Sequence, residues 1–304
     1  MKNLVLCITA ALIFLVNNEV FAVKVMSFNL WTGKPKKKES FIEIIKKADP
    51  DIVIINEAND PETFNAIADA LGYERVLSVH NKYNVGVLSK YKIESQECYA
   101  LETLAKSLVE IKVNIPGWDK PVYIFACHLI ALNLPGRNKK RGVEMETILP
   151  YIQKRMGDHV IFAGDMNEES HLDRPMDENC ISRSIESIGL IDSYRNYFKS
   201  PEVSPGFTHN ILMIPTKRID YIYISNGLEV SNSETLGKLF YSPWPSDHAA
   251  LLSEINLKPI ITPDAPAAPP VPETPETKQI LASVVKPEQP KKKVKKKKIE
   301  VIKN

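Results

Sequence analysis

The chain has 304 residues, of which 44% are apolar and 25% are charged, and its formal net charge at pH 7 is +2. This length and apolar content are enough to bury one large core or two small ones. Residues 23–258 contain 28 basic and 31 acidic residues, and this mildly acidic balance excludes a generic nucleic-acid clamp, whose surface positive charge would dominate.

The first 22 residues have the pattern of a secretory signal peptide. Lys2 supplies the positive start, residues 4–16 form an apolar run, and Val20-Phe21-Ala22 fits a small-residue cleavage site. The run is too short to remain as a membrane span. We therefore expect a secreted or periplasmic protein with a signal peptide at 1–22.

Three cysteines, Cys98, Cys127 and Cys180, remain after removal of the signal peptide. An odd number implies no complete disulfide framework. Cys127 lies in an apolar strand and is expected to be part of the core, whereas pairing of Cys98 with Cys180 stays open.

Apolar periodicity and turn residues define the elements of residues 23–258. In chain order we expect a strand over 23–29, a helix over 41–48, a strand over 51–56, a helix over 61–71, strands over 73–79, 84–88, 92–98, 108–113 and 122–127, a helix over 143–155, a strand over 160–163, a helix over 180–188, and strands over 218–225, around Val230 and over 249–255. Helices alternate with strands and many strands pair locally, so the pattern predicts a mixed α/β domain with two sheets.

The composition changes from Pro259 onward. Nine of the 22 prolines lie there, followed by KKKVKKKK at 291–298. This composition predicts a disordered, extended tail over 259–304 with a cationic end. The tail could bind an anionic surface, as an envelope tether or a nucleic-acid contact, or it could serve solubility alone.

Polar residues end or follow apolar strands at several places that are far apart in the chain. They are Asn29, Glu57, His128, Asp165, Asn167, Asp220, Asp247 and His248. A buried charge without a partner costs several kcal/mol, so these groups are expected to gather and satisfy one another. Carboxylates and an amide suit a hard cation such as Mg²⁺ or Mn²⁺, and no Cys/His cluster has the spacing of a structural zinc site.

Asp165 and Asn167 lie in FAGDMN, directly after the strand over 160–163, and Gly164 lets the chain turn where the strand ends. Side chains at i and i+2 of an extended segment point the same way. A carboxylate that accepts and an amide that donates and accepts could hold a water molecule against an anionic oxygen. The alternative is ordinary turn chemistry, in which Asp and Asn are also common.

Seven motifs together resemble the endonuclease/exonuclease/phosphatase superfamily, whose members are similar to pancreatic deoxyribonuclease. In order, they are VMSFNLW (25–31), DIVIINEAN (51–59), NVGVLSK (84–90), FACHL (125–129), FAGDMN (162–167), RIDYIYIS (218–225) and SDHAALLSEI (246–255). The resemblance covers nearly all of 23–258. It implies a four-layer α/β/β/α sandwich of two mixed sheets with outer helices and an active site at one edge.

The resemblance also implies how a divalent cation is held. Glu57 matches the main metal carboxylate, with Asn29 beside it, and Asp247 matches a further metal or water-holding carboxylate. Asp165 and Asn167 match the pair that orients the attacking water and holds the phosphate.

The remaining roles concern the phosphoryl group. His248 matches the histidine that contacts the phosphoryl oxygen, with Asp220 as its carboxylate partner, and His128 matches the second active-site histidine. Asn84 occupies the place of a residue that steadies that histidine in some members. The alternatives are an edge charge for Asp220, a satisfied core histidine for His128 and a turn residue for Asn84.

Two basic loops, 34–38 and 137–141, follow strands that carry site residues, so we expect them to flank the cleft. Arg137 and Arg141 would then contact the substrate, either a nucleic-acid backbone or an anionic head group. The alternative is solvated loop charge. Trp244 could cover the substrate or pack in the core.

The leading hypothesis is a secreted, monomeric, metal-dependent phosphodiesterase, most similar to an endonuclease. Sphingomyelinase-like and phosphoinositide or phosphomonoester phosphatase activities come next. Abasic-site members carry Asp at the position of Trp31, which argues against DNA repair. A different class, a non-catalytic binding protein for anionic surfaces, stays open, although both histidines and all four carboxylates favour an enzyme.

Overall fold

The computed structural model describes residues 22–32, 37–78, 84–131, 136–175 and 180–259. The predicted tail and nearly all of the predicted signal peptide lie outside these residues, as does most of the basic loop over 34–38. Their predicted roles therefore stay predictions.

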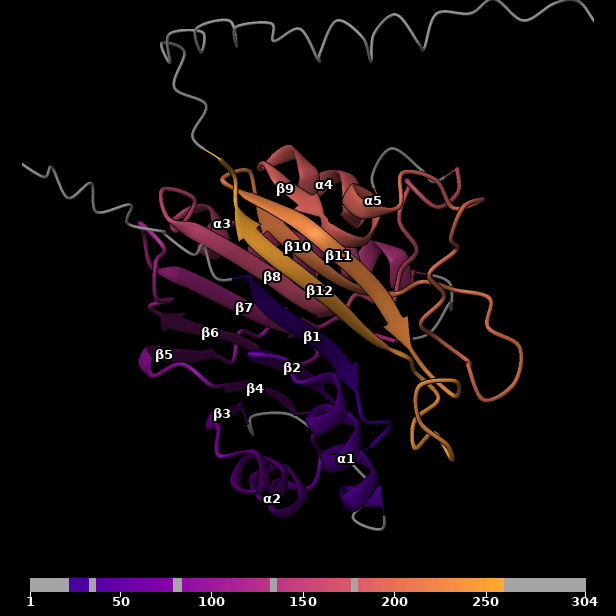
Figure 1. Ribbon diagram of the computed structural model, residues 1–304. Helices are drawn as coiled ribbons and strands as arrows, with labels where there is room; N and C mark the ends of the chain where they lie inside the picture. Colours follow the sequence, from indigo (N-terminus) through magenta and orange to yellow (C-terminus); the bar gives the residue numbers. More distant parts are fainter. Residues whose placement is uncertain (1–21, 33–36, 79–83, 132–135, 176–179, 260–304) are drawn as a thin grey trace, which may run out of the picture. The chain divides into compact units, whose positions relative to one another are not determined.

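The described residues form two six-stranded sheets (Figure 1). The first sheet has the order β11 (Leu228–Leu236), β12 (Ala250–Leu257), β1 (Val23–Asn29), β2 (Ile52–Asn56), β4 (Val85–Ser89) and β3 (Glu74–Ser78). The second has the order β5 (Ile93–Tyr99), β6 (Leu108–Val113), β7 (Val122–His128), β8 (His159–Asp165), β10 (Asp220–Ser225) and β9 (Leu190–Asp192). In each sheet one inner pair is parallel, β1 with β2 and β7 with β8, and the other neighbours are antiparallel. The predicted pair of mixed sheets is confirmed.

The helices are α1 (Lys38–Ala48), α2 (Pro61–Leu71), α3 (Arg137–Gln153), α4 (Ile181–Ser187) and α5 (Ser193–Tyr197). Sequence chemistry explains their ends. Asp60 caps α2 by accepting from the Thr63 amide, and Gly72 ends α2 in the left-handed conformation. None of the helices in the described ranges is both long and apolar enough to cross a membrane.

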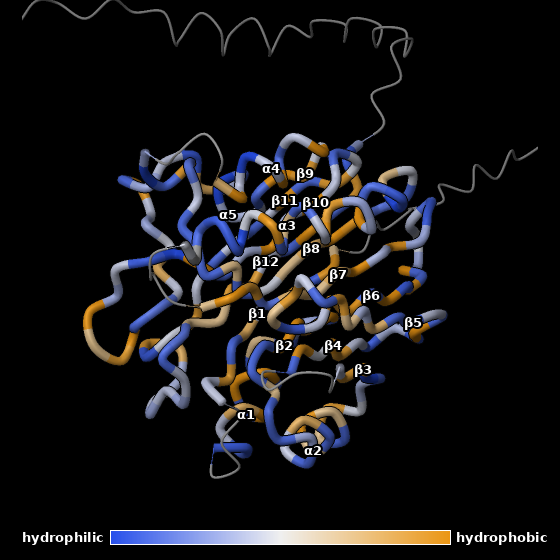
Figure 2. Tube along the Cα trace, turned by 180° about the vertical axis from the view of Figure 1, so that it is seen from behind, coloured by the Kyte–Doolittle hydropathy of each residue, from blue (hydrophilic) through white to orange (hydrophobic). Residues whose placement is uncertain are grey.

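Three apolar clusters show the layer order. Alternate residues of β1 point to opposite faces, so Val25 packs between the sheets while Met26 packs against α1 and α2. The second sheet behaves in the same way, with Ile124 on the inner face and Phe125 packed against α3 and α4. Figure 2 shows the apolar residues concentrated along the strands. The α/β/β/α sandwich is therefore confirmed.

One prediction about local structure was wrong, and two short elements were not predicted. The expected basic loop over 137–141 is the start of α3, because Gly136, with φ of 80°, precedes the helix and the Lys and Arg residues that follow are good helix formers. The sequence also showed no sign of β9 and α5, whose three and five residues are too short for a periodic pattern.

The cysteines of the described ranges are all free. Cys98 is partly buried, and Cys127 and Cys180 are buried. The Sγ atom of Cys127 lies 3.6 Å from the Met166 sulfur within the core, so Cys127 is the core residue that its strand position predicted.

Gly164 allows β7 and β8 to approach each other beside the polar strand ends. Its φ of 141° lies in a region that favours glycine. A Cβ atom at this position would lie 1.9 Å from the carbonyl oxygen of Cys127, its partner on β7. Asp165 follows directly, so this glycine also determines where the Asp165 carboxylate points.

Gly164→Ala is expected to lower the free energy of unfolding by at least about 1–3 kcal/mol, since backbone strain and overpacking add. Urea denaturation measures the loss. Gly157→Ala is the matched control, because a Cβ atom there meets nothing within 4 Å. Equal stability of the two variants would show that the β7–β8 contact does not require glycine.

Candidate active site

The last residues of four central strands meet at one edge of the two sheets. Asn29 of β1 is paired with Asn56 of β2, and His128 of β7 is paired with Asp165 of β8. Asn56 joins the sheets: its Nδ2 donates to the Cys127 carbonyl at 2.8 Å, and its Oδ1 accepts from the Asp165 amide at 3.0 Å. Parallel strands place their carboxyl ends together, which is why residues so far apart in the sequence converge here.

Asp165 is the centre of this group. Its Oδ2 accepts from Asn29 Nδ2 at 3.0 Å and lies 3.5 Å from His128 Nε2 and 3.9 Å from His248 Nε2. Its Oδ1 accepts from the Asn167 amide at 2.9 Å. Burial, with the negative charge of Asp220, raises the pKa of Asp165 to about 6. Asp165 is therefore mainly a carboxylate at neutral pH and becomes neutral in mild acid.

Glu57 follows β2 and lies across Asn29 from Asp165. Its Oε1 is 3.4 Å from Asn29 Nδ2, and its Oε2 accepts from the Thr32 amide at 2.7 Å. Burial raises the pKa of Glu57, although these hydrogen bonds oppose the shift. Glu57, Trp31 and Thr32 all have positive φ, and such strain is common where a backbone is held for function.

His248 is held through its side chain and through its backbone. Its Nδ1 lies 2.8 Å from Asp220 Oδ2, and its amide donates to Ser246 Oγ, which itself donates to the Asn29 carbonyl. Burial lowers the pKa of His248, but the charge and hydrogen bond of Asp220, with Asp165 and Asp247, outweigh burial and raise it to about 10. His248 is therefore an imidazolium at neutral pH whose Nε2 faces Asp165.

The oxygen-rich side of the site fits a divalent cation. Within the described residues, Asp220 Oδ1 and Asp247 Oδ1 are buried without a hydrogen-bond partner. A buried carboxylate oxygen without a donor is costly, and a cation would compensate for it. If a cation binds, Glu57 and Asp247 would supply the carboxylate oxygens that hard divalent ions prefer, and Asn29 Oδ1, which accepts from the Trp31 amide at 2.9 Å, would supply an amide oxygen.

Asn167 and Asn84 lie nearby with different surroundings. Asn167, with φ of 52°, donates from Nδ2 to the Leu129 carbonyl at 3.1 Å, beside His128. Asn84 is bonded through its backbone to Asn59 and Ala58, which follow Glu57. The proposed steadying of His128 by Asn84 stays a prediction.

Arg141 is buried, so the expectation that it lies in a solvated basic loop is wrong, and its burial argues against the predicted contact with the substrate. Its side chain is only 1% exposed, and Nε lies 3.1 Å from Glu168 Oε2. The Arg141 guanidinium also donates a hydrogen bond to the Ile130 carbonyl. Its positive charge is thus paired with Glu168 inside the protein. The side chain of Arg137 lies outside the described part of the chain. Trp244 is buried against Phe28, which favours packing over substrate cover.

The sequence did not single out five residues of this region. Asn56 and Ser246 lie within recognised motifs, beside site residues, and their strand-end positions could have drawn attention to them. Thr208 Oγ1 accepts a hydrogen bond from the Asp220 amide. The centroid of the His209 ring lies 5.0 Å from that of the His248 ring. Lys106 is buried, and its Nζ donates to the Leu129 carbonyl at 2.8 Å. No sequence pattern points to these last three.

Lys106 adds a positive charge behind the histidine side of the site. Burial lowers its pKa, whereas the charges of Asp165, Glu144 and Glu57 oppose this shift. Burial also lowers the pKa of His128 well below the usual value, and Lys106 and His248 contribute in the same direction. His128 is thus neutral while His248 is charged, so the two histidines are prepared for different tasks.

Solved structures share this fold. One is an endonuclease/exonuclease/phosphatase protein from Beutenbergia cavernae, with a TM-score of 0.64, 18% identity, and coverage of 78% of this chain and 72% of that chain. TDP2 of D. rerio, solved with a single-stranded DNA product, has a TM-score of 0.60 and 15% identity and covers 77% and 99% of the two chains. The human Nocturnin catalytic domain, solved with a sulfate anion, has a TM-score of 0.61 and 19% identity and covers 78% and 95%.

A search of curated proteins finds no match. The family model described as the Endonuclease/Exonuclease/phosphatase family matches residues 26–248, which is most of the chain and includes every polar strand end described above. The chain therefore belongs to the endonuclease/exonuclease/phosphatase family of metal-dependent phosphoester hydrolases.

Proposed function

We propose that this protein is an exported phosphodiesterase that cleaves nucleic acid as an endonuclease does, with Mg²⁺ or Mn²⁺ as its cation. The observation that carries the proposal is the convergence of Glu57, Asp165 and the Asp220–His248 pair around Asn29. Phosphodiester hydrolysis needs charge neutralisation on the phosphate, an aligned water and stabilisation of the leaving oxygen, and this group of side chains can provide all three.

Each side chain has a distinct task in this proposal. Glu57, Asn29 and Asp247 would hold the cation, which when bound polarises a phosphoryl oxygen. The Asp165 carboxylate accepts a proton from the attacking water, and Asn167 orients that water beside it. His248, as an imidazolium fixed by Asp220, donates a hydrogen bond to a phosphoryl oxygen.

The neutral His128 is the second donor to the phosphate in this scheme. Its Nε2 lies 3.5 Å from Asp165 Oδ2, so it faces the same space as His248 Nε2. A neutral imidazole donates one hydrogen bond without adding a charge. The two histidines together would thus hold the phosphate while only one of them carries charge.

The signal peptide and the lysine-rich tail support the location that we propose. An N-terminal segment with the pattern of a secretory signal favours export. The KKKVKKKK segment at 291–298 would attract an anionic surface such as nucleic acid or the cell envelope, and could keep the enzyme close to its substrate. A monomer would be sufficient for this activity, since one chain carries every site residue.

A lipid phosphodiester is the second candidate substrate, and one surface feature favours it. Met213, Ile214 and Leu239 are 77%, 73% and 105% exposed. They belong to two segments that touch, because Lys238 Nζ donates to the Leu212 carbonyl at 2.7 Å. An apolar loop projects at the left edge of Figure 2. Exposed apolar residues beside lysines are typical of surfaces that contact membranes.

A panel of substrates tests both candidates and the non-catalytic alternative. The mature chain is incubated with plasmid DNA, with sphingomyelin vesicles and with a small phosphodiester, each with Mg²⁺ and with a chelator. Cleavage of DNA that the chelator abolishes is the expected result. Preferential cleavage in vesicles, lost in Met213→Ser/Ile214→Ser but retained on the small diester, would favour the lipid. If no substrate is hydrolysed in a chelator-sensitive manner, a binding protein for anionic surfaces becomes the better account.

A further inference from the structure

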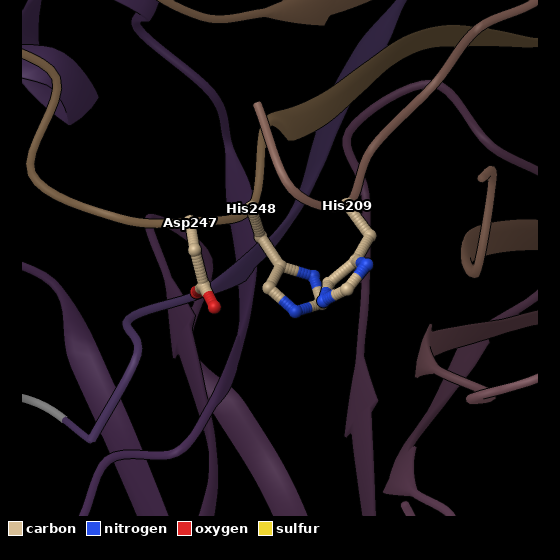
Figure 3. Close-up of side chains that lie close together, drawn as sticks. All are labelled: His209, Asp247 and His248. Atoms are coloured by element: carbon tan, nitrogen blue, oxygen red, sulfur yellow. The ribbon is translucent and has the colours of Figure 1, made fainter. Parts of the chain in front are cut away.

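His209, Asp247 and His248 form a second cluster of potential ligands, which shares Asp247 and His248 with the site described above. One ligand atom from each of the three lies within 4.8 Å of the others. Figure 3 shows the three side chains pointing into a common space. His209 precedes β10 in the sequence, whereas Asp247 and His248 precede β12, so the tertiary fold brings them together.

The backbone around this cluster holds its members in place. His209 and His248 face each other across an isolated antiparallel β-bridge. On either side of them, the Ala249 amide donates to the Thr208 carbonyl at 2.7 Å, and the Ile211 amide donates to the Asp247 carbonyl at 3.0 Å. Because backbone hydrogen bonds join the two segments on both sides of the histidines, the three residues are held close together without a bound ligand.

Two ligand atoms of the cluster have no hydrogen-bond partner within the described part of the chain, and the third, His248 Nε2, becomes a ligand atom once it loses its proton. Among the described residues, His209 Nδ1 and Asp247 Oδ1 are buried without a hydrogen-bond partner. His248 has its Nδ1 engaged by Asp220 at 2.8 Å, which leaves Nε2 as its available nitrogen. When one ring nitrogen of a histidine binds a metal ion, the other ring nitrogen is usually hydrogen-bonded to a group such as a carboxylate.

The chemistry of the cluster differs from that of the oxygen-rich side. Two imidazoles and one carboxylate favour Zn²⁺ and related transition metals over Mg²⁺, which prefers oxygen ligands. Catalytic zinc sites also use three protein ligands and leave a further position open. The pattern was not visible in the sequence, because His209 lies 38 residues before Asp247 in a loop.

We propose that His209, Asp247 and His248 bind a transition-metal ion of the Zn²⁺ type, and that occupation of this site inhibits the enzyme. The inhibitory part rests on the proposed function. Binding of the ion displaces the proton of His248 Nε2 and occupies the nitrogen that would contact the phosphate. It also withdraws Asp247 from the ligands of the hard cation. A chain that meets zinc outside the cell would then be switched off by it.

The competing explanation is that His209 only packs against His248. Their rings meet edge to face, with centroids 5.0 Å apart and planes at 66°. Two aromatic rings that only pack against each other also adopt this geometry. Packing alone predicts that replacing His209 changes stability without changing metal affinity. The two explanations therefore differ in a quantity that can be measured directly.

Metal binding is measured on the mature chain without substrate, by Zn²⁺ calorimetry and by the visible absorption of bound Co²⁺, in the presence of millimolar-range Mg²⁺. We compare His209→Asn with His171→Asn, since His171 is partly buried and its Nε2 lies 3.2 Å from Glu186 Oε2, outside this cluster. Affinity is expected to fall about 10- to 100-fold or more in His209→Asn and to be unchanged in His171→Asn. Unaltered affinity in His209→Asn, or no Co²⁺ band with the unmodified chain, would overturn the site.

Inhibition is a separate readout, so the two parts of the proposal can fail independently. For each protein, the rate of hydrolysis with Zn²⁺ is divided by its own rate without Zn²⁺. We expect the concentration for half-inhibition to rise in His209→Asn by the same factor as the affinity falls. Zinc that binds at full occupancy without slowing hydrolysis would overturn the inhibitory role. Absence of any hydrolysis would contradict the proposed function, and the Co²⁺ measurement would still decide whether the metal site exists.

Discussion

His248→Ala is expected to lower the rate of phosphodiester hydrolysis by about 10²–10⁴-fold. His248 is an imidazolium because Asp220 lies 2.8 Å from its Nδ1, and its Nε2 faces Asp165. Alanine removes the only side chain that, in our scheme, brings a positive charge from the protein to the phosphate. Turnover of the small diester at saturating Mg²⁺ measures the effect.

The control for this variant is His171→Ala, which removes an imidazole that no proposed step uses. Circular dichroism and thermal unfolding must show that His248→Ala remains folded, since its ring also fills space beside His209. A folded His248→Ala protein that keeps near-normal turnover would remove His248 from the site. Asp220→Asn should give a smaller loss in the same direction, because the amide retains the shape of the carboxylate but loses its charge.

The dependence of activity on pH provides an independent check on the same residue. The pKa of Asp165 is about 6 and that of His248 is about 10. Activity needs the Asp165 carboxylate, so it is expected to fall as pH drops through about 6. It also needs the charged His248, so it should fall as pH rises toward about 10. In His248→Ala the residual activity should lose the alkaline decrease and keep the acidic one.

Glu57→Gln is expected to lower turnover at a fixed Mg²⁺ concentration by about 10²–10⁴-fold, with metal affinity reduced by at least about 10- to 100-fold. Glutamine has the shape of glutamate and can still accept from the Thr32 amide. The fold is therefore expected to survive while the negative charge that attracts the cation is lost. Titration with Mn²⁺, followed by its magnetic resonance signal, measures the affinity.

Glu62→Gln, on the exposed side of α2, is the matched control for this change. It removes the same charge five residues away without touching the site. If Glu57→Gln and Glu62→Gln bind Mn²⁺ equally well, then Glu57 is not a metal ligand. A stability loss in Glu57→Gln much larger than in Glu62→Gln would instead assign Glu57 a structural role, through its bonds to Thr32 and Asn29.

Local rules in the sequence predicted two mixed sheets and a gathering of the polar residues at the strand ends, whereas the four-layer sandwich was implied by the family resemblance. Apolar strands that end in polar residues identify β1, β2, β7 and β8, and parallel neighbours must bring those ends together. Asn29 and Asp165 are the clearest case, since they lie 136 residues apart and their side chains meet at 3.0 Å. The family resemblance then added roles that the pattern could not supply.

Residues whose roles depend on tertiary contacts could not be predicted. Arg141 looks like a free surface charge in the sequence, yet Glu168 pairs with it inside the protein. Lys106 and His209 lie in segments without a periodic pattern, and only the packing of other elements brings them to the site. Short elements such as β9 and α5 contain too few residues to show a period. For Arg141, Lys106 and His209, the missing information was the contacting residue, which is distant in the sequence.

We expect side chains from both sheets to gather around a single hard cation beside Glu57. Crystals grown with Mn²⁺ and measured for anomalous scattering would locate this cation. We predict one strong anomalous peak in contact with the Glu57 carboxylate, with Asn29 and Asp247 next to it. A fully occupied Mn²⁺ located elsewhere, with Glu57 turned away from it, would contradict our account of this site.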